Sequence, residues 1–203
     1  MLKIYFVRHG QNEDNANGIL NGHRDLPLTD IGRQQARALA EKIKTRRMTF
    51  DTVLVSPLQR AVETAEIIAG VNHLSQPIIE PKLIERDFGV MTSKAQKKIE
   101  KLCAPDIIKT DSTVYFLSPQ GAETFPALMV RARELLDDIY KKYSDGNILL
   151  VSHGDFGKIL YAEYYHLDWR SVLTEWNLGN AEMLLLSPDS PADEAVIIKN
   201  RQD

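Results

Sequence analysis

This 203-residue chain has only one cysteine, no long apolar run and no excess of basic residues. The one cysteine, Cys103, excludes an internal disulfide framework and favours a reducing compartment. No apolar run has the length of a membrane-spanning helix, and the first residues lack the pattern of a signal peptide. We therefore expect a cytoplasmic protein with no membrane partner. A formal net charge of −3 also argues against a nucleic-acid partner, which would need a broad basic face.

Length and composition indicate one well-buried globular domain over residues 1–203. Apolar residues make up 43% of the chain and charged residues 26%, which is ordinary for such a domain. The length is only marginal for two domains. Within it we expect a core of residues 1–89 and 121–203. The least regular segment, about residues 90–120, would be a small cap inserted at the sheet edge.

Three short apolar runs, rich in β-branched residues, each end in a polar cluster. Ile4–Val7 leads into Arg8-His9-Gly10, Val53–Val55 into Ser56-Pro57-Leu58-Gln59-Arg60, and Ile148–Val151 into Ser152-His153-Gly154. Such runs are typical of parallel strands buried on both faces. They predict an α/β fold, a three-layer sandwich with a mostly parallel central sheet and helices on both faces. Ligands bind beyond the carboxyl ends of strands in such sheets, so the polar clusters should meet there.

Helical spacing and turn residues predict the elements between these strands. Helices should begin after the cap residue Thr29, at Pro57, near Glu123 and near Lys158. The second of these should end at Gly70, and the third near Asp145-Gly146. Residues 11–25 should form a functional loop, and a short helix should lie near residues 95–102. A short strand is expected at residues 76–80, and a closing hairpin at Met183–Leu186 and Ala195–Ile198.

The converging side chains are those that phosphoryl transfer from a monoester requires. Arginine pairs with phosphate through two parallel hydrogen bonds, which Arg8 and Arg60 can supply. A neutral histidine with one ring nitrogen free is a nucleophile, and two arginines should lower its pKa. A carboxylic acid near phosphate, such as Glu85, can protonate the leaving oxygen. A metal site on His9 and His153 is a weaker alternative, because the arginines would repel a cation.

Four ordered clusters resemble those of the histidine phosphatase superfamily, the group that includes cofactor-dependent phosphoglycerate mutases. The resemblance covers most of the chain outside the cap. The matching residues are Arg8-His9-Gly10-Gln11, Asn15, Leu28-Thr29, Gly32, Gln35-Ala36, Ser56-Pro57-Leu58, Arg60-Ala61, Thr64-Ala65, Glu85, Phe88-Gly89 and Ser152-His153-Gly154.

The resemblance implies a role for each site residue. His9 would accept the phosphoryl group as phosphohistidine, and Glu85 would protonate the leaving oxygen and then activate water. Arg8, Arg60 and His153 would hold the phosphate. The residues expected to bind substrate around them are Gln11, Asn12, Asn15, Gly22 and Gly154. Neither a metal nor an organic cofactor is expected, and the partner would be a small phosphorylated metabolite.

The sequence departs from the family's pattern in three features, and the last of them, a spacing, favours a phosphatase over a mutase. Asn12 stands where the family usually has a small hydroxyl residue, although an amide can donate the same hydrogen bond. No glycine follows Gly89 within residues 90–94. The Glu85–His153 spacing is also shorter than the resemblance implies for mutases. The alternatives that stay open are a phosphoglycerate-mutase-type phosphotransferase and a catalytically weakened phospholigand-binding protein.

Several other residues are expected to have structural roles only. A solvated helix face accounts for Lys94, Lys97 and Lys98, and hydrogen-bonded structural positions account for His23, His73 and His166. Which phosphorylated substrate is used stays open, as does the oligomeric state. An edge strand at Met183–Leu186 could pair two copies into a dimer.

Overall fold

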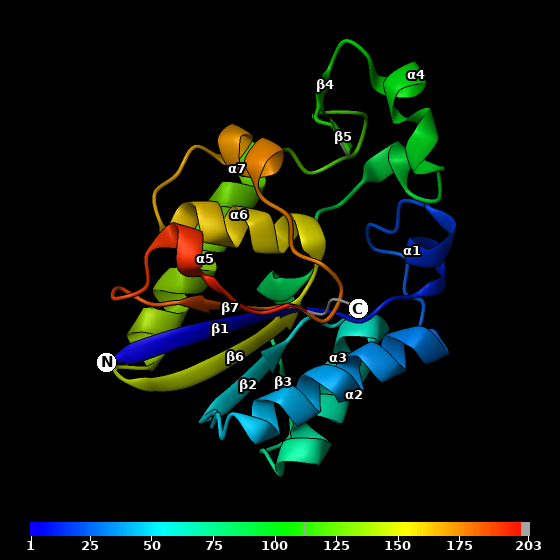
Figure 1. Ribbon diagram of the computed structural model, residues 1–203. Helices are drawn as coiled ribbons and strands as arrows, with labels where there is room; N and C mark the ends of the chain where they lie inside the picture. Colours follow the sequence, from blue (N-terminus) through cyan, green and yellow to red (C-terminus); the bar gives the residue numbers. More distant parts are fainter. Residues whose placement is uncertain (112, 200–203) are drawn as a thin grey trace.

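The computed structural model describes residues 1–111 and 113–199, and its centre is a mixed six-stranded sheet (Figure 1). The strand order is β3 (Ile78–Ile79), β2 (Thr52–Val55), β6 (Gly146–Ser152), β1 (Leu2–Arg8), β7 (Met183–Leu186) and β8 (Val196–Ile198). The first four strands pair in parallel, whereas β7 runs antiparallel to both β1 and β8. The closing hairpin is therefore confirmed.

Helices cover both faces of this sheet, as Figure 1 shows. On one face lie α2 (Asp30–Thr45) and α3 (Gln59–Asn72), and on the other α5 (Phe125–Lys142), α6 (Gly154–Tyr164) and α7 (Trp169–Glu175). Each layer is joined to the sheet by its own apolar cluster, one containing Leu39, Ile43 and Ile68, the other Leu128, Leu135 and Ile159. The predicted α/β three-layer sandwich is confirmed.

Residues 89–111 and 113–116 lie outside these layers, beside the short helix α1 (Glu13–Asn17) (Figure 1). They form 3-10 turns at Gly89–Met91 and Gln96–Lys98, helix α4 (Ile99–Cys103), and an antiparallel pair of strands, β4 (Ile107–Lys109) and β5 (Val114–Phe116). A small apolar cluster holds them to the core, made of Leu20, Phe88, Met91, Ile99 and Phe116. Their role as a cap stays a prediction. Two further 3-10 turns lie at Pro81–Leu83 and Ala192–Glu194.

The predicted starts of two helices were wrong. Helix α3 begins at Gln59, so Pro57 precedes it and does not occupy its first turn. Helix α6 begins at Gly154, four residues before the predicted Lys158. Gly154 and Asp155 have low helix propensity, and neither is an apolar residue that continues the buried stripe of α6. The hydrophobic periodicity therefore does not reveal the first turn of α6.

Other predicted boundaries also shift. Helix α3 continues past Gly70 to Asn72, and His73 closes it in the left-handed conformation (φ 54°). Gly70 has open space around it, and a helix tolerates a glycine there at a modest cost. The long helix α5 ends at Lys142, three residues before the predicted Asp145-Gly146. Within the predicted loop 11–25, Asn12 caps helix α1.

The loop leaving β1 packs directly against the first turn of α2, and this contact depends on two glycines. A Cβ on Gly32 would lie 2.0 Å from the carbonyl oxygen of Gln11, and one on Gly10 would lie 2.4 Å from the carbonyl oxygen of Gly32. Both neighbours are backbone atoms, which cannot swing aside. The absence of side chains here therefore fixes where Arg8-His9-Gly10 leaves the sheet.

We expect Gly32→Ala to destabilise the fold by about 1–3 kcal/mol, because the added methyl forces this backbone apart. Gly70→Ala is the matched control: its Cβ meets nothing within 4 Å, and alanine in a helix should stabilise by about 0.5–1 kcal/mol. Urea unfolding of both variants checks the pair. Equal stability of the Gly32→Ala variant and the wild type would contradict the assigned contact.

Candidate active site

The carboxyl ends of β1, β2 and β6 bring the predicted residues together. Arg8 pairs with Ser152 in the sheet register, and the Ser56 N–H donates to the Val151 carbonyl at 3.0 Å. A cavity of about 480 Å³ lies over these strand ends. Six predicted residues line it: Arg8, His9, Asn15, Arg60, Glu85 and Gly154.

His9 has a defined tautomer. Its Nδ1 lies 2.6 Å from the Gly10 carbonyl oxygen, which can only accept, so Nδ1 carries the ring proton. Nε2 then has a lone pair, and Arg60 Nε donates to it at 3.2 Å. Burial, and then the charges of Arg60 and Arg8, hold the His9 pKa well below its usual value. The ring is therefore neutral at pH 7, with a nucleophilic nitrogen directed at a guanidinium.

The two arginines are oriented by backbone carbonyls, which accept hydrogen bonds but do not neutralise charge. Arg60 has no exposed surface and donates to the carbonyls of Arg24 at 2.7 Å and Gly22 at 3.0 Å. Arg8 donates to the Leu178 carbonyl at 2.7 Å, and its Nε has no partner among the described residues. Burial lowers the Arg60 pKa to about 10, so it stays charged at neutral pH. Two guanidinium groups arranged in this way could hold an anion.

His153 lies behind His9 with no exposed surface, and the two ring centroids are 5.1 Å apart. Its Nε2 lies 2.7 Å from the Ser56 hydroxyl oxygen. When that hydroxyl donates to Nε2, the ring proton sits on Nδ1, which has no partner in the described part of the chain. Burial is the largest cause of its lowered pKa, followed by the charge of Arg60. In that tautomer the neutral ring has an unused N–H donor, although His153 is not among the residues that line the cavity.

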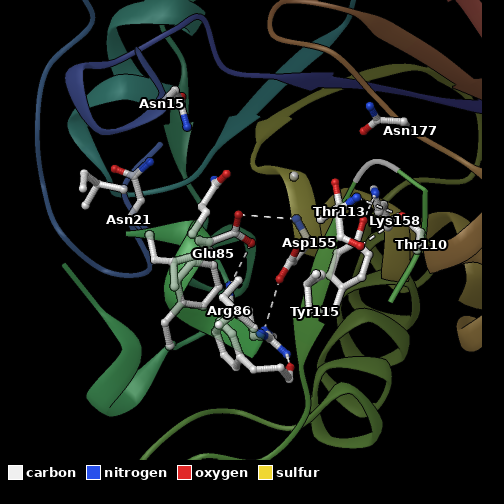
Figure 2. Close-up of a pocket in the computed structure, with 18 of the residues that line it drawn as sticks. Asn15, Asn21, Glu85, Arg86, Thr110, Thr113, Tyr115, Asp155, Lys158 and Asn177 are labelled. Atoms are coloured by element: carbon white, nitrogen blue, oxygen red, sulfur yellow. Dashed lines mark hydrogen bonds and ion pairs between the residues drawn. The ribbon is translucent and has the colours of Figure 1, made fainter. Parts of the chain in front are cut away.

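Glu85 is 7% exposed, and backbone N–H groups hold its carboxyl group. Oε1 accepts from Arg86 at 2.9 Å and from Phe156 at 3.1 Å, and Oε2 accepts from Asp155 at 3.4 Å. Burial raises the Glu85 pKa, and the negative charge of Asp155 raises it further. Figure 2 shows this carboxyl group between Asn15 and Asp155 at the cavity wall. A carboxyl group in this position could exchange a proton with a molecule bound in the cavity.

Three residues expected to bind substrate are not among those that line the cavity. Asn12 is fully buried: its side chain caps α1 and exchanges hydrogen bonds with the Asn21 amide. The Gly22 carbonyl accepts from Arg60, and the Gln11 side-chain oxygen accepts from the Thr29 hydroxyl at 3.1 Å. These residues shape the loop that holds Arg60, so direct phosphate contact by them stays a prediction.

Sequence reasoning missed the residues that position Glu85. Arg86 lies buried between the rings of Phe116 and Phe125, with its Nε 3.2 Å from an Asp155 carboxylate oxygen. Arg131 on α5 donates to the carbonyls of Lys82, Ile84 and Glu85, which fixes the segment before Arg86. Asp155 and Arg131 carry no motif signal. Recognising that α6 starts at Gly154 would have placed Asp155 in the site.

Residues 1–111 and 113–199 contain neither a metal-binding cluster nor a membrane-spanning helix. No three histidine, cysteine, aspartate or glutamate side chains are grouped closely enough there to hold a metal ion. No helix in the same ranges combines the length and apolar character that crossing a membrane requires.

Removing the Arg60 charge should raise the His9 pKa, because that charge is the second-largest cause of its depression. We expect this in Arg60→Gln, measured by ¹⁵N NMR titration of the imidazoles. Arg37→Gln, on the exposed part of α2, is the matched control and should leave the His9 titration in place. If His9 in Arg60→Gln titrates as it does in the wild type, the assigned contact is incorrect.

Comparisons with known proteins agree with this geometry. The model of the histidine phosphatase superfamily (branch 1) matches residues 4–200. A Photorhabdus laumondii protein named as a probable phosphoglycerate mutase is 36% identical over 162 residues. The match covers 76% of this chain and 70% of the Photorhabdus protein. Phosphoserine phosphatase 1 of Hydrogenobacter thermophilus is 28% identical over 179 residues. The match covers 88% of this chain and 82% of the Hydrogenobacter protein.

A solved structure gives the same result. A mycobacterial glucosyl-3-phosphoglycerate phosphatase is 26% identical and superposes with a TM-score of 0.76, covering 91% of this chain and 92% of that one. The relatives thus include proteins named as mutases and as phosphatases, which supports an enzyme that acts on phosphate esters. The chain belongs to the histidine phosphatase superfamily.

Proposed function

We propose that this protein is a phosphatase that hydrolyses small phosphorylated metabolites through a phosphohistidine on His9, without a metal ion. The observation that carries the proposal is the His9 ring, whose Nδ1 is fixed by the Gly10 carbonyl while Nε2 keeps its lone pair beside Arg60. The relatives named as phosphoserine and glucosyl-3-phosphoglycerate phosphatases support this substrate class.

The first step forms the His9 Nε2–phosphorus bond and breaks the bond from phosphorus to the ester oxygen. Arg8, Arg60 and the His153 Nδ1–H bind the phosphoryl oxygens, so the charge developing on them meets donors already in place. A phosphate oxygen takes over the Arg60 Nε–H that His9 accepts in the free site. Glu85 gives its proton to the leaving alkoxide, which departs as an alcohol.

The second step returns the site to its starting state. Glu85, now a carboxylate, accepts a proton from water as the water oxygen attacks phosphorus. The phosphorus–Nε2 bond breaks, inorganic phosphate is released, and Glu85 is again protonated. One carboxyl group therefore acts as acid and then as base, which its raised pKa allows.

His9→Ala should lower the hydrolysis of p-nitrophenyl phosphate at least about 10³-fold, because the nucleophile is lost. EDTA should leave wild-type turnover unchanged. His73→Asn is the matched control: it replaces a histidine in the left-handed position that ends α3, a conformation that asparagine tolerates, and should keep full activity.

Trapping the phosphoenzyme separates the alternatives. Acid-labile, base-stable phosphate on His9 with release to water supports the phosphatase. Label that passes to an alcohol acceptor and not to water identifies a phosphotransferase. Tight phosphate binding with neither label nor release identifies a phospholigand-binding protein.

Asp155→Asn should move the basic limb of the kcat–pH profile to lower pH. Turnover needs neutral His9, so it rises above a histidine pKa that lies well below 6.5, and it needs protonated Glu85, so it falls above a carboxyl pKa that lies above 4.5. The charged groups that face Glu85 are Arg8 on β1, Arg60 on α3, Arg131 on α5, Asp155 and Lys158 on α6, and Arg86. Removing the one other carboxylate among them lowers the Glu85 pKa.

The control for this profile is Asp137→Asn, an exposed carboxylate on the outer side of α5. It should leave both limbs in place. A merely structural role for Asp155 would lower kcat at every pH without moving the basic limb, and that result would contradict the assignment.

A further inference from the structure

Lys158 is a buried cation without a carboxylate partner. It is 6% exposed, and its Nζ donates to the Tyr115 hydroxyl. None of the ion pairs found between described residues includes it. An ammonium group has three N–H donors, and a buried charge is strongly unfavourable unless it is paired. The lysine therefore lacks a counter-charge that a ligand can supply.

The neighbouring acids do not fill this role. Asp155 lies one turn earlier on α6, but its carboxylate is 3.2 Å from Arg86 Nε. Glu85 accepts backbone hydrogen bonds, and its raised pKa favours the neutral acid. Burial lowers the Lys158 pKa to about 8, so the ammonium form still predominates at pH 7.

Lys158 lines the same cavity as His9, and Glu85 and Arg8 are among the charged groups that act on it. Figure 2 shows Lys158 and Tyr115 grouped on one side, with Asn177 near them, and Asn15 and Asn21 on the opposite side of Glu85. A volume of about 480 Å³ falls in the range of sites that enclose whole small ligands, and a single phosphate does not need it. The cavity thus has room for a ligand larger than a phosphate, and both His9 and Lys158 line it.

Tyr115 completes the donor set at this end. Because its hydroxyl oxygen accepts from Lys158, its own proton is free to be donated. Burial raises the Tyr115 pKa, so the hydroxyl stays protonated at neutral pH. The Asn177 amide lines the cavity beside them. The three side chains together offer an ammonium, a hydroxyl and an amide donor, which is a set suited to an anion.

We propose that Lys158, with Tyr115 and Asn177, binds a second anionic group of the substrate, either a carboxylate or another phosphate. This inference rests on the proposed function, because it takes the scissile phosphate to lie at His9. The substrates are then small monoesters with two negatively charged ends, and Lys158 selects them over esters with one.

Binding to the His9→Ala protein tests this without relying on turnover. By calorimetry we compare 3-phosphoglycerate with glycerol 3-phosphate, which has a hydroxymethyl group where the former has a carboxylate. Fructose 1,6-bisphosphate against fructose 1-phosphate tests a second phosphate in the same way. In at least one pair the two-anion ligand should bind about 10- to 100-fold more tightly, the range for hydrogen bonds to a charged group.

Lys158→Met in the same background should abolish this preference, and Lys158→Arg should retain part of it. Lys141→Met, an exposed lysine of α5, is the matched control and should keep it. Tyr115→Phe, which removes only the hydroxyl, should weaken the preference several-fold and gives a second readout if Lys158→Met folds poorly. No preference in either pair, or a preference that survives Lys158→Met, overturns the proposal.

Wild-type turnover of p-nitrophenyl phosphate separates the two proposals. Hydrolysis of this ester without any two-anion preference leaves the phosphatase standing and removes the Lys158 site. A preference that depends on Lys158, with no hydrolysis of any ester, keeps the site and removes the proposed reaction.

Discussion

The site depends on two guanidinium groups, those of Arg8 and Arg60, that lie beside two imidazoles and form no ion pair with any carboxylate of the described residues. Carbonyls of Arg24, Gly22 and Leu178 orient the guanidiniums, yet a carbonyl cannot cancel their charge. Burial is the largest cause of the lowered His9 pKa, and the charges of Arg60 and Arg8 lower it further. A carboxylate added to neutralise the arginines would therefore weaken both this second effect on His9 and any affinity of the site for an anion.

The Glu85 pKa is raised, whereas the His9 pKa is lowered. Three backbone N–H groups favour its ionised form, whereas burial and the Asp155 carboxylate favour the neutral form. Burial is the larger effect, so the pKa rises although the hydrogen bonds act against it. A dianionic phosphate ester would raise it further. The imidazole and the carboxyl group thus have pKa values shifted in opposite directions, which is the arrangement that acid–base chemistry near neutral pH requires.

A site residue could be predicted from the sequence where a local pattern marks its position, and could not where only the folded structure shows its partner. Strand ends are visible in sequence because buried parallel strands are continuous apolar runs, so Arg8, His9, Ser56 and His153 could be placed together. Asn12 could not be assigned in this way, because an amide suits another amide as well as a phosphate, and only the folded loop shows that Asn21 is its partner. The early turn of α6 has no apolar periodicity, so Asp155 was missed there, although Gly154 beside it was predicted from the motif.

The two ends of the cavity are built by different parts of the chain. Strand ends and the first turn of α3 provide the end of the cavity that His9 lines. Near that end, Gly10 and Gly32 have no space for a Cβ atom. Tyr115 at the other end comes from a two-stranded sheet that shares no hydrogen bonds with the central one. Arg86 connects these parts, because it donates to the Phe116 carbonyl while its Nε faces Asp155 on α6. A change in residues 107–111 or 113–116 could therefore alter the shape of the cavity while His9 keeps its geometry. Arg86 is the route by which such a change would reach Glu85.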